Sequence, residues 1–305
     1  MSMLHVLMPP LGRVTENAAF RHWLSRGDRL PPKADARTAV LRELFRFAGD
    51  AIPSAALRHL CHTDDAKMGA WLCADPAWIQ GEATGARLMA WPVTDLSATE
   101  AGELAAELRP LFGDAGMPLS VDTPSEWCAH LPHGAPPATF TCPADALGVD
   151  LMECLPAGEA GRLWRRLFNE AQILLHAHPV NAVRVAAGRR PVNALWLWGT
   201  GALPEAVASG VQTVASVDDV VRGLAKMAGA VRVEPLPEAI GAAPRAGDVL
   251  VDLDIPGHAE GPAGWLVHFE RWLRERRFDV VILTFADGER FRLRHAHRLR
   301  FWRRR

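Results

Sequence analysis

The sequence predicts an α/β protein with a largely parallel sheet. Short apolar runs, each about as long as a buried strand, alternate with stretches whose apolar residues recur at helical spacing. Strands that alternate with helices favour parallel pairing, because each helix carries the chain back to the start of the next strand. The 305 residues, 49% hydrophobic and 23% charged, suffice for one large domain or two smaller ones.

The predicted elements follow the chain in order. Predicted strands are short apolar or β-prone runs, namely Leu4–Met8, Ala70–Ala74, Arg87–Trp91, Ala194–Trp198, Val211–Ala215, Asp248–Leu253, Asp279–Phe285 and Phe291–Arg294. Predicted helices are Ala18–Leu24, Ala39–Ala48, Ser54–His62, Ser97–Phe112, Val217–Met227 and Gly264–Arg276. We expect loops at Arg26–Lys33 and Pro235–Gly247, where proline, glycine or polar residues accumulate.

Local signals support three of these assignments. Ser97 precedes its helix and Glu100 lies three residues on, which is the capping-box pattern. Ser216 is the cap that we expect for the helix beginning at Val217. Asp287-Gly288 lies between two β-prone runs and predicts a tight hairpin.

The stretch from Trp164 to Pro204 contains the main candidate site. Pro179 ends one helix, and two polar residues follow at a spacing of three, which places them on one face of a new helix turn. A second Pro-x-Asn leads into an apolar strand and then a Gly-Thr-Gly turn, and open α/β sheets usually bind ligands where such strands end. The pattern predicts a cleft for an anionic ligand, formed by Asn181, Arg184, Asn193, Gly199 and Gly201. A capped helix, a strand and a tight turn without a ligand are the alternative.

The charge, hydrophobicity and cysteine content of the sequence argue against some classes of protein. The net charge of −1 argues against a surface devoted to nucleic acid or membrane, and no apolar run approaches the twenty or so residues that span a bilayer. The five cysteines show no disulfide framework, and MSMLHVLMPP lacks the features of a signal peptide. We therefore expect a cytoplasmic protein.

Three segments carry a resemblance to a known family. HPVNAVRVAAGRRPVNALWLWGTGALP resembles a stretch of the archaeal-type, cofactor-independent phosphoglycerate mutases, which belong to the alkaline phosphatase superfamily. VDLDIPGHAEG is similar to the family's Asp-x-x-x-His-x-x-Gly, which places Asp254 and His258 on metal-binding positions, and VVILTFADG places Asp287 on another. The resemblance implies an alkaline-phosphatase-like core of residues 1–69 and 143–305, with a basic tail. Residues 70–142 would form a small inserted α+β subdomain.

The departures from that family bear on activity. Where the family's first strand ends in Asp-Gly, Met8 is followed by two prolines, and Gly288 replaces the histidine expected after Asp287. No nucleophile segment of the Thr-Pro-Asn type is recognisable between Ala34 and Thr63. Asp254, His258 and Asp287 are too few to fill two hard-metal shells. We expect no cofactor beyond a residual divalent ion (Mn, Zn or Mg), and no catalytic residue is identified.

LMECLPAG, WRRLFNEAQILLHAHPVN and NALWLWGTGALP resemble a narrower group, the RpfE-type regulatory proteins of xanthomonads and related proteobacteria. That resemblance implies an association with virulence regulation and no established activity. The leading hypothesis is a non-catalytic protein that binds a phosphorylated or anionic small molecule, or a protein partner. The alternatives are an active metal-dependent phosphoglycerate mutase or phosphatase, and a nucleic-acid-binding regulator that uses the tail Arg290–Arg305. The last is disfavoured because arginine alternates there with Phe291 and Leu293, as on an edge strand.

Two further sets of residues suggest zinc. One consists of His59, Cys61, His62 and Cys73, and the other of Cys128, His130 and His133. Neither set has paired Cys-x-x-Cys spacing, and helical periodicity spreads the first over different faces. We therefore do not expect zinc at either set.

Overall fold

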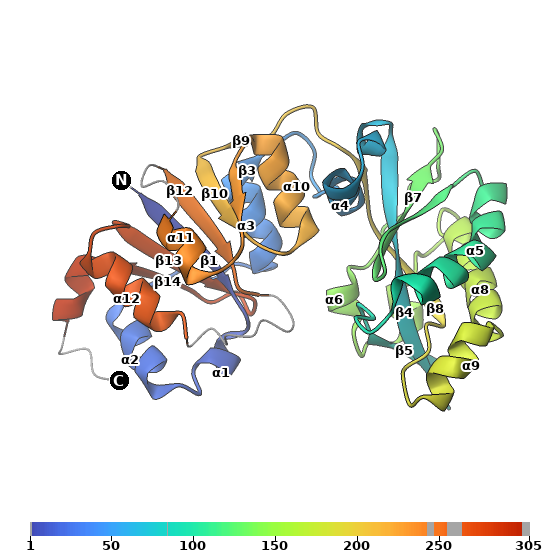
Figure 1. The fold of residues 1–305 in the computed structure, drawn as a ribbon, viewed down its shortest axis with the longest axis horizontal. Coiled ribbons are helices and arrows are strands. Elements are labelled where there is room, and N and C mark those ends of the chain that lie inside the picture. Colours follow the sequence, from blue (N-terminus) through green and yellow to red (C-terminus); the bar gives the residue numbers. More distant parts are fainter. Residues whose placement is uncertain (1, 84, 243–246, 255–263, 301–305) are drawn as a thin grey trace. The chain divides into compact units, whose positions relative to one another are not determined.

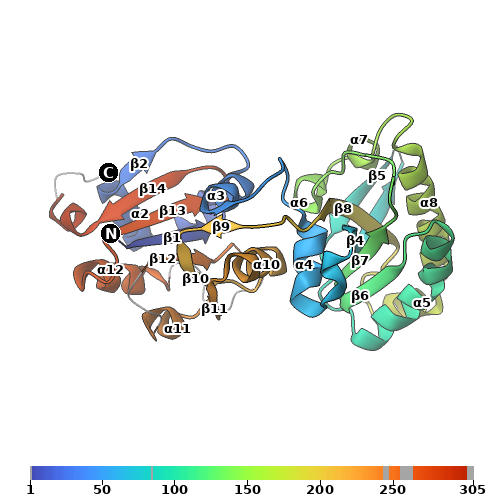
Figure 2. The same cartoon turned by 90° about the horizontal axis from the view of Figure 1, so that it is seen from above.

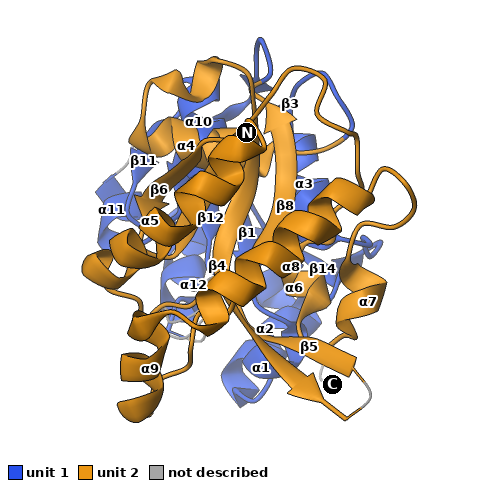
Figure 3. Ribbon diagram, turned by 90° about the vertical axis from the view of Figure 1, so that its right-hand side faces the viewer, with its two compact units in different colours: residues 1–50, 204–305 blue, residues 51–203 orange. Residues whose placement is uncertain are grey.

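The computed structural model describes residues 2–83, 85–242, 247–254 and 264–300, and the chain divides into two compact units. Unit 1 comprises residues 1–50 and 204–305, and unit 2 comprises residues 51–203 (Figure 3). Unit 2 extends beyond the insertion predicted at residues 70–142. The reason is that β8 (Ala194–Ala202) pairs along β4 (Ala70–Glu82), which ties the later segment to the same sheet.

Unit 1 is built on a mixed sheet. Its described strands follow the order β11-β10-β12-β1-β13-β14-β2 (Figure 2). They are β1 (Met3–Met8), β2 (Asp28–Leu30), β10 (Val211–Ala215), β11 (Val231–Val233), β12 (Asp248–Asp252), β13 (Val280–Phe285) and β14 (Arg290–Arg294). The strands from β11 to β13 in this order are parallel, and β14 is antiparallel to both of its neighbours. The predicted α/β class with a largely parallel sheet is confirmed.

The helices of unit 1 pack on this sheet. They are α1 (Leu11–Val14), α2 (Ala18–Arg26), α3 (Ala36–Leu44), α10 (Asp219–Ala228), α11 (Pro237–Ala242), α12 (Leu266–Arg274) and the 3-10 turn η2 (His295–Leu299). Helices α2 and α12 meet side by side, where Trp23 stacks on Phe269 with ring centroids 6.0 Å apart. A short ribbon of β3 (Phe45–Arg46) and β9 (Ala208–Ser209) also belongs to unit 1.

Unit 2 is built on an antiparallel sheet in the order β5-β4-β7-β6, with β8 also paired to β4. Its other elements are α4 (Ser54–His62), η1 (Asp65–Lys67), β5 (Gly85–Ala90), α5 (Ala98–Asp114), β6 (Leu119–Thr123), β7 (Glu126–Leu131), α6 (Pro143–Ala146), α7 (Leu151–Cys154), α8 (Arg162–His176) and α9 (Pro179–Ala186). Helices α5 and α8 cover one face of the sheet, and α4 covers the other (Figures 1 and 2). Across the described part of the chain, no helix has the length and apolar character needed to cross a membrane.

Several local predictions are confirmed. Helix α4 has the predicted bounds, and Ser97 and Glu100 form the predicted capping box at the start of α5. Strands β13 and β14 form the predicted hairpin about Asp287-Gly288.

Other local predictions are wrong. Gly199 and Gly201 lie within β8 and not in a turn, because glycine lets the strand pass close to α4: an added Cβ would lie 2.9 Å from Ser54 and 2.8 Å from Pro53, respectively. The two expected loops contain β2 and α11. The cap of α10 is Asp218, whose carboxylate accepts from two backbone N–H groups, and not Ser216. Strand β14 is not an edge strand, since β2 covers it.

A buried carboxylate connects the elements of unit 2. Asp75 on β4 is 1% exposed, and Arg58 of α4 donates to both of its oxygens at 2.8 Å. The indole N–H groups of Trp91 and Trp198 donate to Oδ2 at 3.0 and 2.8 Å, and the backbone N–H of Trp127 donates to Oδ1 at 3.1 Å. These five hydrogen bonds satisfy the charge and fix α4, β4, β7 and β8 to one another.

We expect Asp75→Ala to lower the free energy of unfolding by about 3–5 kcal/mol, because the buried Arg58 charge loses its partner. Urea unfolding followed by fluorescence measures the change. Glu82→Ala is the matched control, because Glu82 is an exposed carboxylate on the same strand that pairs with the exposed Arg87. That variant should lose at most about 1 kcal/mol. Equal losses in the two variants would contradict the central role of Asp75.

Candidate functional site

Polar side chains gather at the carboxyl edge of the parallel sheet in unit 1. Asp252 is the last residue of β12 and is fully buried, and Asp254 lies two residues beyond it. Ser216 and Asp218 follow the end of β10, which is the neighbouring strand. These four residues are called the carboxyl-edge cluster below. Ligands of open α/β sheets bind at such an edge.

A guanidinium group from α3 lies among these carboxylates. Arg37 Nη1 donates to Asp252 Oδ1 at 2.9 Å, and its Nη2 donates to Asp252 Oδ2 at 2.8 Å and to Asp218 Oδ2 at 2.9 Å. Ser216 Oγ donates to Asp252 Oδ2 at 3.0 Å. The other oxygen of Asp218 accepts from the first backbone N–H groups of α10. Both oxygens of Asp252 and both of Asp218 are therefore engaged.

Electrostatics strengthens this ion pair. Burial disfavours the charged guanidinium, but Asp252 and Asp218 outweigh that effect and raise the pKa of Arg37 above its ordinary value. Burial raises the pKa of the Asp254 carboxyl, and the charge of Arg37 offsets only part of that rise. The edge thus combines three groups. They are the cationic Arg37, the Asp252 carboxylate that Arg37 binds through both oxygens, and the Asp254 carboxyl, whose pKa is raised.

The predicted metal ligands fit a two-metal centre poorly. Asp254 and Asp287 do follow the ends of β12 and β13, whereas His258 lies outside the described residues. Asp287 Oδ2 accepts from the backbone N–H of Leu11 at 2.9 Å, at the start of α1. Two divalent ions would need far more oxygen ligands than Asp254 and the remaining Asp287 oxygen supply. The described residues therefore do not fit a pair of hard metal ions.

The two asparagines of the predicted cleft lie in unit 2 and bond to its backbone. Asn181 Nδ2 donates to the carbonyl groups of Leu175 and Val192 at 2.7 Å each, and its Oδ1 accepts from the Val192 N–H at 2.8 Å. Asn193 forms a similar pair of hydrogen bonds, both 2.8 Å, with the N–H and carbonyl of Ile79. Both side chains join segments that are distant in sequence.

Arg184 is also used within unit 2. It lies on α9 with Asn181, as predicted, and its side chain is 0% exposed. Its guanidinium donates to Asp95 Oδ1 at 2.7 Å and contacts both oxygens of Glu100 at 3.3 Å. Burial raises the pKa of Glu100, but hydrogen bonds from Ser97 and the nearby guanidinium groups outweigh it and lower the pKa to about 2. An anion-binding role for Asn181, Arg184, Asn193, Gly199 and Gly201 stays a prediction.

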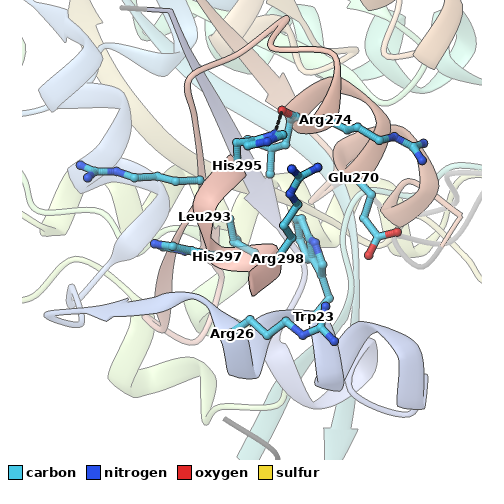
Figure 4. Close-up of a pocket in the computed structure, with 10 residues that line it drawn as sticks. Trp23, Arg26, Glu270, Arg274, Leu293, His295, His297 and Arg298 are labelled. Atoms are coloured by element: carbon cyan, nitrogen blue, oxygen red, sulfur yellow. Dashed lines mark hydrogen bonds between the residues drawn. The ribbon is translucent and has the colours of Figure 1, made fainter. Parts of the chain in front are cut away.

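Unit 1 contains a cavity of about 180 Å³ with basic walls (Figure 4). Its lining comes from α2, α12 and the segment β14–η2, and consists of Trp23, Arg26, Glu270, Leu273, Arg274, Leu293, Arg294, His295, His297 and Arg298. Four arginines and one glutamate line it, together with Trp23 and two leucines. We call it the basic cavity.

The histidines of the basic cavity differ in their bonding. His295 Nδ1 donates to the carbonyl of Leu273 at 3.0 Å (Figure 4). His297 is 5% exposed, and its buried Nδ1 has no hydrogen-bond partner among the described residues. Burial, and then the charge of Arg300, lower the pKa of His297, so its ring is neutral near pH 7. The sequence indicated the arginines of the tail, but it gave no sign that α2 and α12 complete the cavity.

The structure does not keep the two Cys/His sets of the sequence analysis together as groups. His59 of the first set lies with Cys128 of the second and with Asp122, which sequence reasoning missed. Cys61 donates to the Leu57 carbonyl at 3.6 Å, and His130 Nε2 donates to the Met68 carbonyl at 2.9 Å.

Comparisons with known proteins identify similar chains. No family model matches. The 2,3-bisphosphoglycerate-independent phosphoglycerate mutase of Methanosarcina barkeri is 38% identical over 65 residues, which are 21% of this chain and 16% of that protein. A protein of Geobacter sulfurreducens described as a probable mutase of the same kind is 34% identical over 96 residues, which are 30% of this chain and 24% of that protein. The chain thus matches less than a quarter of the length of either relative.

Two solved structures are also similar. The PH0037 protein from Pyrococcus horikoshii gives a TM-score of 0.48 at 14% identity, over 95% of this chain and 86% of that one. The cofactor-independent phosphoglycerate mutase from Thermoplasma acidophilum gives 0.44 at 15% identity, over 96% and 90%. The sequence matches show homology to the phosphoglycerate mutases over part of the chain. The narrower RpfE-type resemblance stays a prediction.

We expect Arg184→Ala to destabilise the protein by about 3–5 kcal/mol, because it leaves Glu100 without its buried partner. Arg189→Ala is the control, since Arg189 bonds to the same carboxylate but its side chain is 36% exposed. Its loss should stay below about 1 kcal/mol. Urea unfolding of both variants provides the measurement. If Arg184→Ala keeps full stability and loses only ligand binding, the predicted cleft is right and the structural role is not.

Proposed function

We propose that this chain is a phosphoglycerate-mutase-like binding protein without mutase activity, which recognises a phosphorylated or otherwise anionic small molecule. The absence of mutase activity is inferred from one observation: the guanidinium of Arg37 lies among the carboxylates at the carboxyl edge of the sheet. The partial homology to phosphoglycerate mutases supports the ligand class. The basic cavity supports it independently.

The chemistry implied by the resemblance needs two divalent ions that clamp the phosphoryl oxygens. Asp252 gives both of its oxygens to Arg37, and Asp218 divides its oxygens between Arg37 and the N-terminus of α10. A metal ion that used these carboxylates would have to displace a guanidinium and would meet its positive charge. The edge therefore favours a fixed ion pair over a metal centre.

The basic cavity suits a small anion. Guanidinium groups bind phosphate and carboxylate oxygens with two parallel hydrogen bonds, and four arginines line this cavity. The neutral ring of His297 and the indole of Trp23 would add a polar contact and an apolar wall. Pockets for drug-sized ligands occupy about 300–1,000 Å³, so 180 Å³ favours a smaller molecule. In the regulatory role that the RpfE-type resemblance implies, the protein would bind a metabolite without consuming it.

The full chain should show no interconversion of 3-phosphoglycerate and 2-phosphoglycerate with added Mn²⁺ or Mg²⁺, because Arg37 occupies carboxylate oxygens at the carboxyl edge. A coupled assay measures the rate, and the Methanosarcina barkeri mutase is the positive control. Metal-dependent turnover would overturn the proposal in favour of a shortened enzyme. The Arg37→Ala variant tests whether Arg37 is the cause of the missing activity. If the guanidinium excludes the metal, this variant should gain stability from added Mn²⁺ that the wild type does not gain.

For the basic cavity, we expect inorganic phosphate and 3-phosphoglycerate to raise the melting temperature more than chloride does at equal ionic strength, because both bind the folded chain. Arg274→Ala and Arg298→Ala should each weaken binding about tenfold, which corresponds to about 1.4 kcal/mol for a charged hydrogen bond. Calorimetric titration measures the affinities.

Arg271→Ala is the matched control, because Arg271 lies on the same helix as Arg274, outside the cavity lining. Equal weakening by Arg271→Ala would show a general charge effect. Binding that needs residues after Arg294 and favours nucleic acid, with a steep salt dependence, would support the nucleic-acid alternative instead.

A further inference from the structure

We propose that unit 2 holds a zinc site formed by His59, Asp122 and Cys128. The three side chains come from α4, β6 and β7, and their ligand atoms all lie within 4.8 Å of one another. All three side chains are buried: the side-chain exposures are 1% for His59 and 3% for Asp122, and the Cys128 residue is 2% exposed. A buried group of nitrogen, oxygen and sulfur ligands is typical of zinc.

The distances match three corners of a tetrahedron. His59 Nδ1 lies 2.9 Å from each carboxylate oxygen of Asp122 and 3.3 Å from Cys128 Sγ, and Sγ lies 3.5 Å from Asp122 Oδ2. Zinc binds nitrogen and oxygen at about 2.0–2.2 Å and sulfur at about 2.3 Å, which at tetrahedral angles separates the ligand atoms by about 3.3–3.6 Å. An expansion of a few tenths of an ångström therefore accommodates the ion.

Hydrogen bonding alone accounts for the group less well. A ring nitrogen carries at most one hydrogen, which the two oxygens of one carboxylate can share, so the Cys128 sulfur is left without a donor from His59. Here two carboxylate oxygens and one sulfur converge on His59 Nδ1 within 3.3 Å. A cation between them would satisfy all three side chains at once.

The surrounding residues orient the histidine as a metal ligand would be oriented. His59 Nε2 lies 3.0 Å from Asp65 Oδ1 and 3.1 Å from Thr63 Oγ1. Metal-binding histidines generally donate the second ring N–H to a carboxylate, which fixes the tautomer and leaves the other nitrogen for the metal. Ser120 Oγ likewise donates to Asp122 Oδ1 at 3.2 Å and holds that carboxylate in place.

Charge balance also favours a divalent ion. The Cys128 sulfur and the Asp122 carboxylate both belong to this buried group. Zn²⁺ would bind the thiolate and release its proton to solvent. One thiolate, one carboxylate and one Zn²⁺ form a neutral unit, which a buried position tolerates far better than an isolated charge.

The ligand set selects zinc over harder ions. Thiolate and imidazole suit zinc, whereas Mg²⁺ and Mn²⁺ prefer oxygen ligands. Cys73 is the register partner of Cys128, but its Sγ contacts the Arg58 guanidinium at 3.2 Å, so we leave it outside the set. A water molecule would complete the four-coordinate shell.

The test uses the full chain, purified under reducing conditions, dialysed against excess zinc and then against zinc-free buffer. Elemental analysis should give about one zinc per chain, and Cys128→Ser and His59→Ala should lose it. Cys61→Ser is the matched control, since Cys61 is also on α4 and its thiol donates to the Leu57 carbonyl, so it should keep the zinc. Less than a tenth of an equivalent in the wild type overturns the proposal, as does full retention by Cys128→Ser.

A second measurement does not depend on the variants folding. Co²⁺ added to the metal-free wild type should produce the absorption of a thiolate-to-cobalt charge transfer, together with tetrahedral ligand-field bands. Competition with Zn²⁺ should abolish both. Cobalt that binds without the thiolate band would place the metal elsewhere and overturn the assignment.

Discussion

Guanidinium groups, buried in unit 2 and partly exposed in unit 1, hold carboxylates in place, and the arrangement of each unit depends on this pairing. Arg58 and Asp75 join α4 to the sheet of unit 2, Arg184 and Glu100 join α9 to α5, and Arg37 and Asp252 join α3 to β12. A buried ion pair adds little net stability over an apolar pair, but loss of one partner is costly. Such pairs therefore fix relative positions more than they add stability. At the carboxyl edge, the same pairing occupies the carboxylates that a metal would need.

The tryptophans have a related role. The chain has eleven tryptophans and no tyrosine, so indole N–H groups replace the phenolic hydroxyl as aromatic hydrogen-bond donors. Trp91 and Trp198 donate to Asp75, whereas Trp71 and Trp196 donate to the backbone carbonyl groups of Ala66 and Thr141. An indole is a donor only, so each of these four rings is oriented by one acceptor on a neighbouring segment. This composition thus contributes to the hydrogen-bond network of unit 2.

The sequence predicted what local physics determines. The Ser97 capping box, the bounds of α4 and the Asp287-Gly288 hairpin each depend on residues a few positions apart, and all three are found. The partners of buried polar groups depend on tertiary packing instead. Asn181 and Arg184 share a face of α9 as predicted, yet that spacing gives no hint that backbone carbonyl groups and carboxylates of the same unit surround them.

Local sequence says even less about which residues meet in the candidate sites. Arg37 lies 215 residues from Asp252, and His59 lies 63 residues from Asp122, so no motif could connect either pair. The segment VDLDIPGH did direct attention to the end of β12, although to Asp254 and not to the buried Asp252. Only the parallel order of the strands shows that Asp218 and Asp252 end at the same edge.

The ion pair at the carboxyl edge and the zinc site proposed in unit 2 depend on different ligand chemistry. Evidence about one is therefore not evidence about the other. At the carboxyl edge of unit 1, hard oxygen ligands are occupied by a guanidinium that is covalently part of the chain and stays protonated at any physiological pH. In unit 2, a thiol, an imidazole and a carboxylate converge on a position that a borderline-soft ion fits. Zinc bound to the second group lies among side chains of the antiparallel sheet and α4, and not at the edge of a parallel sheet where the resemblance implies phosphoryl chemistry. One equivalent of zinc would therefore be evidence about the folding of unit 2. Only turnover that depends on added Mn²⁺ or Mg²⁺ would be evidence for a mutase.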